Sequence, residues 1–186
     1  TYLIQHPGTV SAAIIMGTGQ NTAATITAGR LLARLLSHTV GAERSSGLIE
    51  KLAFGSYNKV FAPNRTPYDW LSVNEENVDR YLADPLCGGR VSIGLFLDML
   101  SGIQLIQNPH NLSAMDRLTP VLFISGDHDP VGGMGKGVKA AFQSFRQNGV
   151  QDLTLKLYEG LRHEILNEAC SNTVYQDLWA WITQHM

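Results

Sequence analysis

Two polar side chains near the end of the chain each follow an apolar run and could together move a proton. Asp129 comes after the apolar run 120–125, and His163 comes after the apolar run 153–158. A carboxylate that accepts a hydrogen bond from one imidazole nitrogen fixes the tautomer, so the other nitrogen can act as a general base. The two residues are therefore candidates for the acid and the base of a nucleophile–histidine–acid triad.

The spacing of these candidates fits neighbouring strands of one parallel sheet, because one strand–helix–strand unit separates Asp129 from His163. The carboxyl ends of parallel strands meet at one edge of a sheet, so we expect the two side chains to lie within reach of each other. Asp127 precedes Asp129 closely and is an alternative acid. Aspartate at either position also fits ordinary turn chemistry.

The sequence offers no obvious nucleophile for this pair. A serine on a sharp strand-to-helix turn needs the pattern G-x-S-x-G, and the chain does not contain it. The nearest match surrounds Ser92, but Arg90 stands where the first glycine belongs and the segment reads as helix. Ser125 follows the bulky Phe123 by two positions and shares the strand of the candidate acid, so neither serine is a credible nucleophile.

Metal and nucleotide chemistry find little support in the sequence. The other histidines do not form H-x-x-x-H or H-E-x-x-H pairs. The glycine-rich segment 132–137 departs from a phosphate-binding loop, because Gly137 stands where serine or threonine should follow Lys136. We therefore expect no metal and no other cofactor, and we interpret these glycines as a turn into the next helix.

The bulk composition describes one globular domain or a large part of one. The chain has 186 residues, 44% of them apolar, and a net charge of −2 without a basic patch, so nucleic acid is not an expected partner. No stretch reaches the roughly 18 apolar residues that span a bilayer. Cys87 and Cys170 lie far apart and form no paired motif. Two reduced cysteines favour a cytoplasmic location.

The order of predicted elements indicates an α/β fold with a parallel sheet. The apolar patterning predicts strands at 10–17, 120–125 and 153–158. It predicts helices at 23–37, 43–53, 91–106, 136–148 and 173–185, with a further short helix capped by Ser72. The first strand should be covered on both faces. We divide the chain into a core strand with its flanks (1–21), a helical cap or insert (22–118) and a carboxyl-terminal core unit (119–186).

At these residues the chain resembles the monoacylglycerol lipase and lysophospholipase-like α/β-hydrolases of the serine aminopeptidase S33 type. The similar segments, in chain order, are 2–19, 58–72, 84–88, 124–131 and 158–165. Within the fourth segment, Gly126 and Asp129 fit the G-x-x-D acid motif of that group, which favours Asp129 over Asp127. The fifth segment fits its histidine loop and carries His163.

The resemblance implies a partial α/β-hydrolase fold, whose nucleophilic serine we expect upstream of Thr1. The parent protein would hydrolyse carboxylic esters of the monoacylglycerol or lysophospholipid type, and this chain alone would be inactive. The alternatives are another α/β-hydrolase activity (peptidase, dehalogenase or perhydrolase) and a non-catalytic lipid-binding module. An unpaired edge strand at 10–16 would also favour self-association of this chain.

Overall fold

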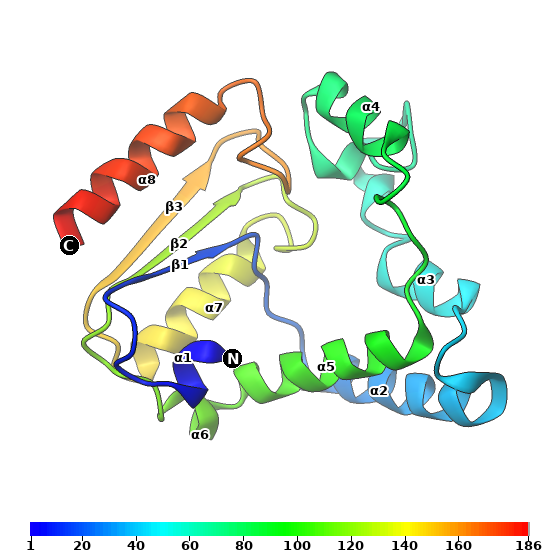
Figure 1. Ribbon diagram of the computed structural model, residues 1–186, viewed down its shortest axis with the longest axis horizontal. Coiled ribbons are helices and arrows are strands. Elements are labelled where there is room, and N and C mark those ends of the chain that lie inside the picture. Colours follow the sequence, from blue (N-terminus) through cyan, green and yellow to red (C-terminus); the bar gives the residue numbers. More distant parts are fainter. Residues whose placement is uncertain (186) are drawn as a thin grey trace.

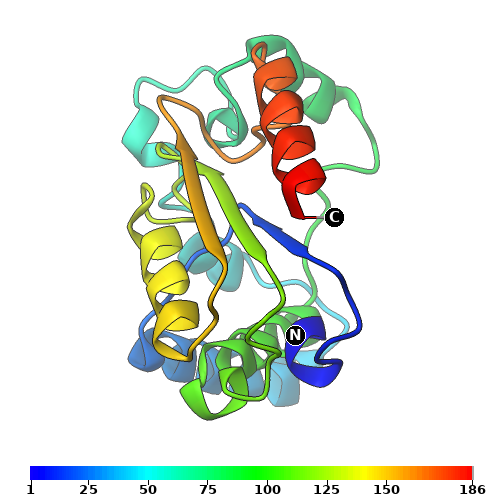
Figure 2. The ribbon, with the colours of Figure 1, turned by 90° about the vertical axis from the view of Figure 1, so that its left-hand side faces the viewer.

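The computed structural model describes residues 1–185 and has a parallel three-stranded sheet at its centre (Figure 1). The strands are β1 (Ala13–Met16), β2 (Val121–Gly126) and β3 (Leu153–Tyr158), in the spatial order β1-β2-β3. Helix α7 (Lys136–Gln147) lies on one face of the sheet and helix α8 (Ser171–His185) on the other (Figure 2). The structure therefore confirms the predicted α/β class and the parallel sheet.

The central strand β2 contributes to the core on both faces of the sheet, because every one of its residues is buried. Leu122 and Ile124 pack with Trp181 of α8, whereas Phe123 packs on the opposite face with Val138 of α7. Successive side chains of a strand alternate between faces, so a continuous apolar run is what a strand covered on both sides requires. The prediction of a strand at 120–125 is confirmed, because this apolar run becomes β2.

Strand β1 is shorter and less covered than the sequence predicted. It pairs with β2 from Ala13 to Met16, and it forms one edge of the sheet among the described residues. Ile14 and Met16 are 37% and 38% exposed, so the expectation of a strand covered on both faces was wrong. The reason is that α8 packs mainly over β2 and β3 and leaves this face of β1 open.

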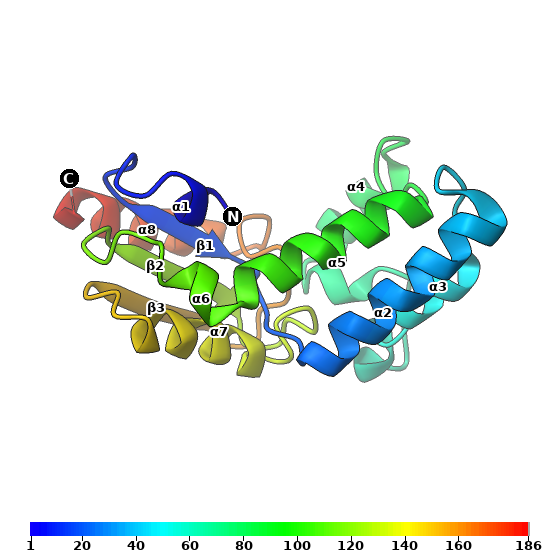
Figure 3. The ribbon, with the colours of Figure 1, turned by 90° about the horizontal axis from the view of Figure 1, so that it is seen from below.

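The residues between β1 and β2 form mostly helices that lead away from the carboxyl ends of the strands (Figure 3). Helices α2 (Ala23–Leu36) and α5 (Ile93–Gln107) lie side by side, and Ala33, Ile49, Ile93 and Phe96 form a separate small core there. The remaining helices are α1 (Tyr2–Gln5), α3 (Gly47–Ala53), α4 (Glu75–Ala83) and α6 (Pro109–Leu112), with 3-10 turns at Asn58–Phe61 and Asp69–Leu71 and a π turn at Ser37–Gly41. The division of the chain into a core strand with its flanks (1–21), a helical cap or insert (22–118) and a carboxyl-terminal core unit (119–186) remains a proposal.

Two predicted helix starts were wrong. Helix α3 begins at Gly47 rather than at residue 43, because the carbonyl of Arg44 accepts the N–H of Ile93 at 2.8 Å and ties this stretch to the start of α5. Helix α4 is capped by Asn74, whose side chain accepts the N–H of Glu76. Ser72 instead accepts the N–H of Asn74 and lies outside the helix.

No helix within residues 1–185 combines the length and the apolar character needed to cross a bilayer.

Candidate catalytic site

The two candidate residues meet beyond the carboxyl ends of β2 and β3. Asp129 lies in the loop after β2, and His163 lies in the loop after β3. The imidazole Nδ1 of His163 is 2.9 Å from the carboxylate Oδ2 of Asp129. Because a carboxylate only accepts hydrogen bonds, this contact assigns the proton to Nδ1 and leaves Nε2 as the basic nitrogen.

The carboxylate of Asp129 is fully buried and held from three directions. Its Oδ1 accepts the backbone N–H of Val131 at 2.8 Å, and its Oδ2 accepts the hydroxyl of Ser125 at 3.3 Å in addition to the imidazole. A buried carboxylate without such partners would be costly, so these donors explain why it can stay there. The His163 side chain is 30% exposed, and no residue of the described chain hydrogen-bonds to its Nε2. The His163 imidazole is therefore held at Nδ1 and free of hydrogen bonds at Nε2 within the described chain.

Asp127 serves a different purpose in the structure. Its Oδ1 contacts Nδ1 of His128 at 2.6 Å and accepts the backbone N–H of Gly160 at 2.8 Å. Burial raises the pKa of Asp127, but these hydrogen bonds and the charge of His128 outweigh it and lower the pKa below its usual range. Asp127 thus links the two loops, and it is Asp129 that contacts His163.

Two glycines allow the loops to approach, a role that the sequence reasoning did not assign to them. A Cβ on Gly126 would lie 2.0 Å from the carbonyl oxygen of Leu161, so only glycine lets the histidine loop cross here. Gly17, at the end of β1, has φ of +59°, and a Cβ there would lie 3.0 Å from Cε1 of His163. No local pattern signals these contacts, because Leu161 and His163 lie far along the chain from the two glycines.

Aromatic residues of the helical segment lie against His163. The Trp70 ring is centred 5.5 Å from the His163 imidazole, and the Tyr57 ring is centred 5.2 Å from Trp70. Burial, followed by the negative charge of Asp129, raises the pKa of Tyr57. Asn58 fixes this arrangement, because its side chain accepts the backbone N–H of Trp70 at 2.9 Å and donates to the backbone carbonyl of Thr66 at 2.7 Å. The sequence shows that aromatic residues are frequent in this segment, but it did not predict that they lie against His163.

None of the remaining nucleophile candidates hydrogen-bonds to His163 in the described part of the chain. Ser92 caps α5 by accepting the N–H of Leu95, and the buried Ser125 donates to Asp129 rather than to His163. Cys87 and Cys170 are both free thiols. Within residues 1–185, no three His, Cys, Asp or Glu side chains gather as metal ligands would.

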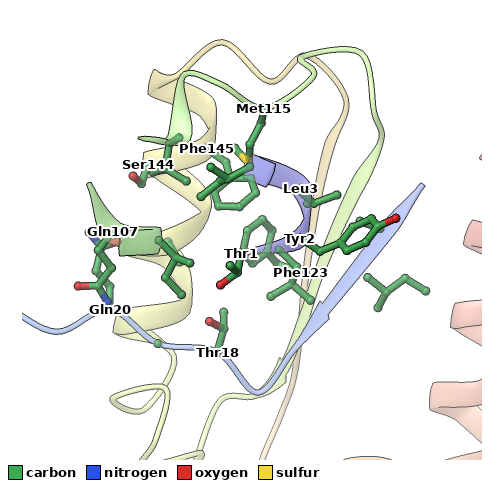
Figure 4. A pocket seen from close by; sticks show the side chains of 18 of the residues that line it. Thr1, Tyr2, Leu3, Thr18, Gln20, Gln107, Met115, Phe123, Ser144 and Phe145 are labelled. Atoms are coloured by element: carbon green, nitrogen blue, oxygen red, sulfur yellow. The ribbon is translucent and has the colours of Figure 1, made fainter. Parts of the chain in front are cut away.

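A separate apolar hollow of about 420 Å³ lies beside β1, and neither Asp129 nor His163 lines it. Its walls come from α1, β1, β2, α7 and the end of α5, and Figure 4 shows Tyr2, Phe123 and Phe145 among the lining side chains. The hollow adjoins the open edge of the sheet. The sequence reasoning did not anticipate it, because it arises from elements that are distant in the chain.

The model of the family described as serine aminopeptidase, S33, matches residues 1–169. The chain is 30% identical over 120 residues to the monoglyceride lipase of Rattus norvegicus, covering 62% of this chain and 37% of that protein. It is 31% identical over 123 residues to the monoacylglycerol lipase of Mycolicibacterium smegmatis, covering 63% of this chain and 40% of that protein.

Solved structures agree on the fold. A carboxyl esterase from Bacillus coagulans, in complex with glycerol, superimposes with a TM-score of 0.89 at 22% identity, covering 98% of this chain and 59% of that one. The monoacylglycerol lipase of Paleococcus ferrophilus gives a TM-score of 0.67 at 21% identity, covering 100% and 63%. The sheet and the paired loops therefore form part of an α/β-hydrolase fold.

The chain belongs to the serine aminopeptidase S33 family, as the resemblance in its motifs predicted. It spans less than half the length of the curated relatives that it matches.

Proposed function

We propose that Asp129 and His163 are the acid and the base of a serine hydrolase that cleaves carboxylic esters. One observation carries this proposal. At the carboxyl ends of neighbouring strands, the fully buried carboxylate of Asp129 lies 2.9 Å from the partly exposed imidazole of His163. The names of the relatives, which include monoglyceride lipases and a carboxyl esterase, support an ester rather than a peptide as substrate. The serine itself would come from a segment outside these 186 residues.

In the proposed reaction, each group has a separate part. The serine Oγ attacks the ester carbonyl while Nε2 of His163 takes its proton, and Asp129 stabilises the resulting imidazolium through Nδ1. His163 then returns the proton to the leaving alcohol, and the acyl group stays on the serine. A water molecule repeats the sequence, releasing the fatty acid and restoring the serine hydroxyl.

The substrate class is the finer part of the proposal. We propose a monoacylglycerol-type or lysophospholipid-type ester, because the aromatic wall formed by Tyr57 and Trp70 offers an apolar surface beside the base. Two free cysteines are compatible with a reducing compartment, and the cytoplasm is the proposed location.

The proposal is tested in the full-length protein with an aryl ester and with a monoacylglycerol as substrates. Asp129→Asn should lower kcat by about 10⁴-fold, as removal of a triad acid does elsewhere, because the imidazole loses its orienting acceptor. Asp127→Asn is a matched control, since it removes a neighbouring carboxylate that contacts His128 rather than His163. Near-normal turnover in Asp129→Asn would overturn the assignment.

A second candidate function is a non-catalytic module that binds an apolar molecule. The 420 Å³ apolar hollow beside β1 is the observation that favours this candidate. The two proposals differ in the coding sequence upstream of Thr1. A strand followed by G-x-S-x-G there decides for the hydrolase.

A further inference from the structure

The residue before His163 is fastened to the helical segment that faces it. The guanidinium of Arg162 donates to the backbone carbonyl of Asp69 and, at 3.1 Å, to that of Ser72. The same group lies over the Phe61 ring, 3.9 Å from its centre. Burial lowers the pKa of Arg162, while the charges of Asp69 and Glu168 oppose this shift. A partly buried guanidinium that holds two carbonyls orders both the chain that carries it and the chain that it contacts.

The residue after His163 is fastened to the same segment. The backbone N–H of Glu164 donates to the carbonyl of Leu71 at 2.8 Å. Its carboxylate accepts the side-chain amide of Asn77 at 2.6 Å. The general base therefore sits between two residues that each bond to residues 69–77, and Trp70 from that segment lies against its ring.

A third contact comes from Glu168, which is only 2% exposed. Its two carboxylate oxygens accept the backbone N–H groups of Val73 and Asn74, at 3.0 and 3.1 Å. Asn74 caps α4, so the buried charge lies at the positive end of that helix. Arg162 thus binds carbonyls of the segment 69–74, and Glu168 binds its N–H groups.

We propose that Arg162 and Glu168 are positioning residues for His163, and that residues 69–77 are the template on which they hold the base over Asp129. The inference rests on the proposed function of His163. It assigns the segment 69–77 a part in catalysis beyond covering the substrate. Because the segment bonds to the loop on both sides of His163, a shift of either one displaces the imidazole from Asp129.

The test uses the full-length protein and measures kcat and KM separately. Glu168→Gln and Arg162→Met should lower kcat by roughly 10- to 100-fold with little change in KM, because a displaced base weakens the chemical step rather than substrate binding. Arg162→Lys keeps the cation and its donors and should recover part of the lost kcat. Matched controls are Glu50→Gln and Arg90→Met, which remove an ion pair outside residues 69–77 and 159–168 and should leave kcat unchanged.

Hydrogen exchange in the same variants shows whether the two segments depend on each other. Glu168→Gln should speed amide exchange both in the loop 159–168 and in residues 69–77, whereas Glu50→Gln should not. Loss of kcat that only follows a reduced folded fraction, or normal kcat in both Glu168→Gln and Arg162→Met, would overturn the inference.

The same assay separates this inference from the proposed function. If Asp129→Asn is inactive while Glu168→Gln and Arg162→Met are fully active, the positioning role fails and the catalytic pair stands. If Asp129→Asn is itself fully active, the proposed function fails and the positioning role fails with it.

Discussion

At the scale of single residues, the absence of a side chain is as important as its presence. Asp129 supplies the buried acceptor and His163 the basic nitrogen, but their contact depends on Gly126 and Gly17. A Cβ at either glycine would meet the histidine loop at 3.0 Å or less. The candidate site therefore depends on two polar side chains and on the space that the two glycines leave for His163 and its loop.

Gly17→Ala should lower both stability and activity. A residue with a Cβ at positive φ costs about 1–2 kcal/mol of unfolding free energy, and the new methyl group would also press on the His163 ring. Gly160→Ala is the matched control, because Gly160 has φ of +71° and no atom within 4 Å of an added Cβ. Thermal melts should show a loss in both variants, and ester hydrolysis should fall further in Gly17→Ala. Equal activity in the two variants would contradict the proposed contact.

At the scale of elements, one carboxylate stabilises the 3-10 turn that carries Trp70. Asp69 is buried and accepts the backbone N–H groups of Arg65 and Thr66, at 2.6 and 3.1 Å, as well as the Thr66 hydroxyl. Burial raises the pKa of Asp69, but these hydrogen bonds and the charge of Arg65 outweigh it, so its pKa lies below the usual value. The ionised form of Asp69 therefore stabilises the fold.

Asp69→Asn should reduce the free energy of unfolding by about 1–3 kcal/mol at neutral pH, since two backbone donors lose a charged acceptor. A pKa that is lower in the folded state gives stability that is fully present above the unfolded value of about 3.9 and is lost as pH falls through the folded value. The gap between wild type and variant should thus persist from pH 7 to 5 and shrink below about pH 4. Urea melts across this range provide the measurement, and a gap independent of pH would contradict the account.

The same scale shows how far the sequence alone could lead. Elements with strong periodicity, such as β2, β3 and α7, were predicted within one or two residues, because their local pattern and their packing agree. The start of α3 was missed, because Arg44 bonds to Ile93 far along the chain and overrides the helical pattern. The glycine contacts and the bonds of Arg162 and Glu168 also join distant segments, and no local pattern encodes them.

At the scale of the whole molecule, one side of the sheet is open. Strand β1 has exposed Ile14 and Met16, and the apolar hollow lies next to it. An uncovered strand edge beside apolar surface favours pairing with another chain. We therefore propose that this 186-residue chain, when isolated, self-associates along β1.

Light scattering coupled to size exclusion should give a dimer or larger species for the isolated chain. Ile14→Lys should shift it toward the monomer, because a charge on an edge strand disfavours further pairing. Leu86→Lys is the control, since Leu86 is 91% exposed but lies far from β1 in the sequence and outside the sheet. A monomer for the unsubstituted chain would rule out this proposal.

The central claim is that Asp129 and His163 act as one catalytic unit, and one measurement tests it most directly. The values of kcat/KM for Asp129→Asn, His163→Gln and the double variant are compared in the full-length protein. Residues that act as a unit have strongly non-additive effects, so the double variant should be about as impaired as His163→Gln alone. Losses that multiply in the double variant, or near-normal turnover in His163→Gln, would contradict the claim.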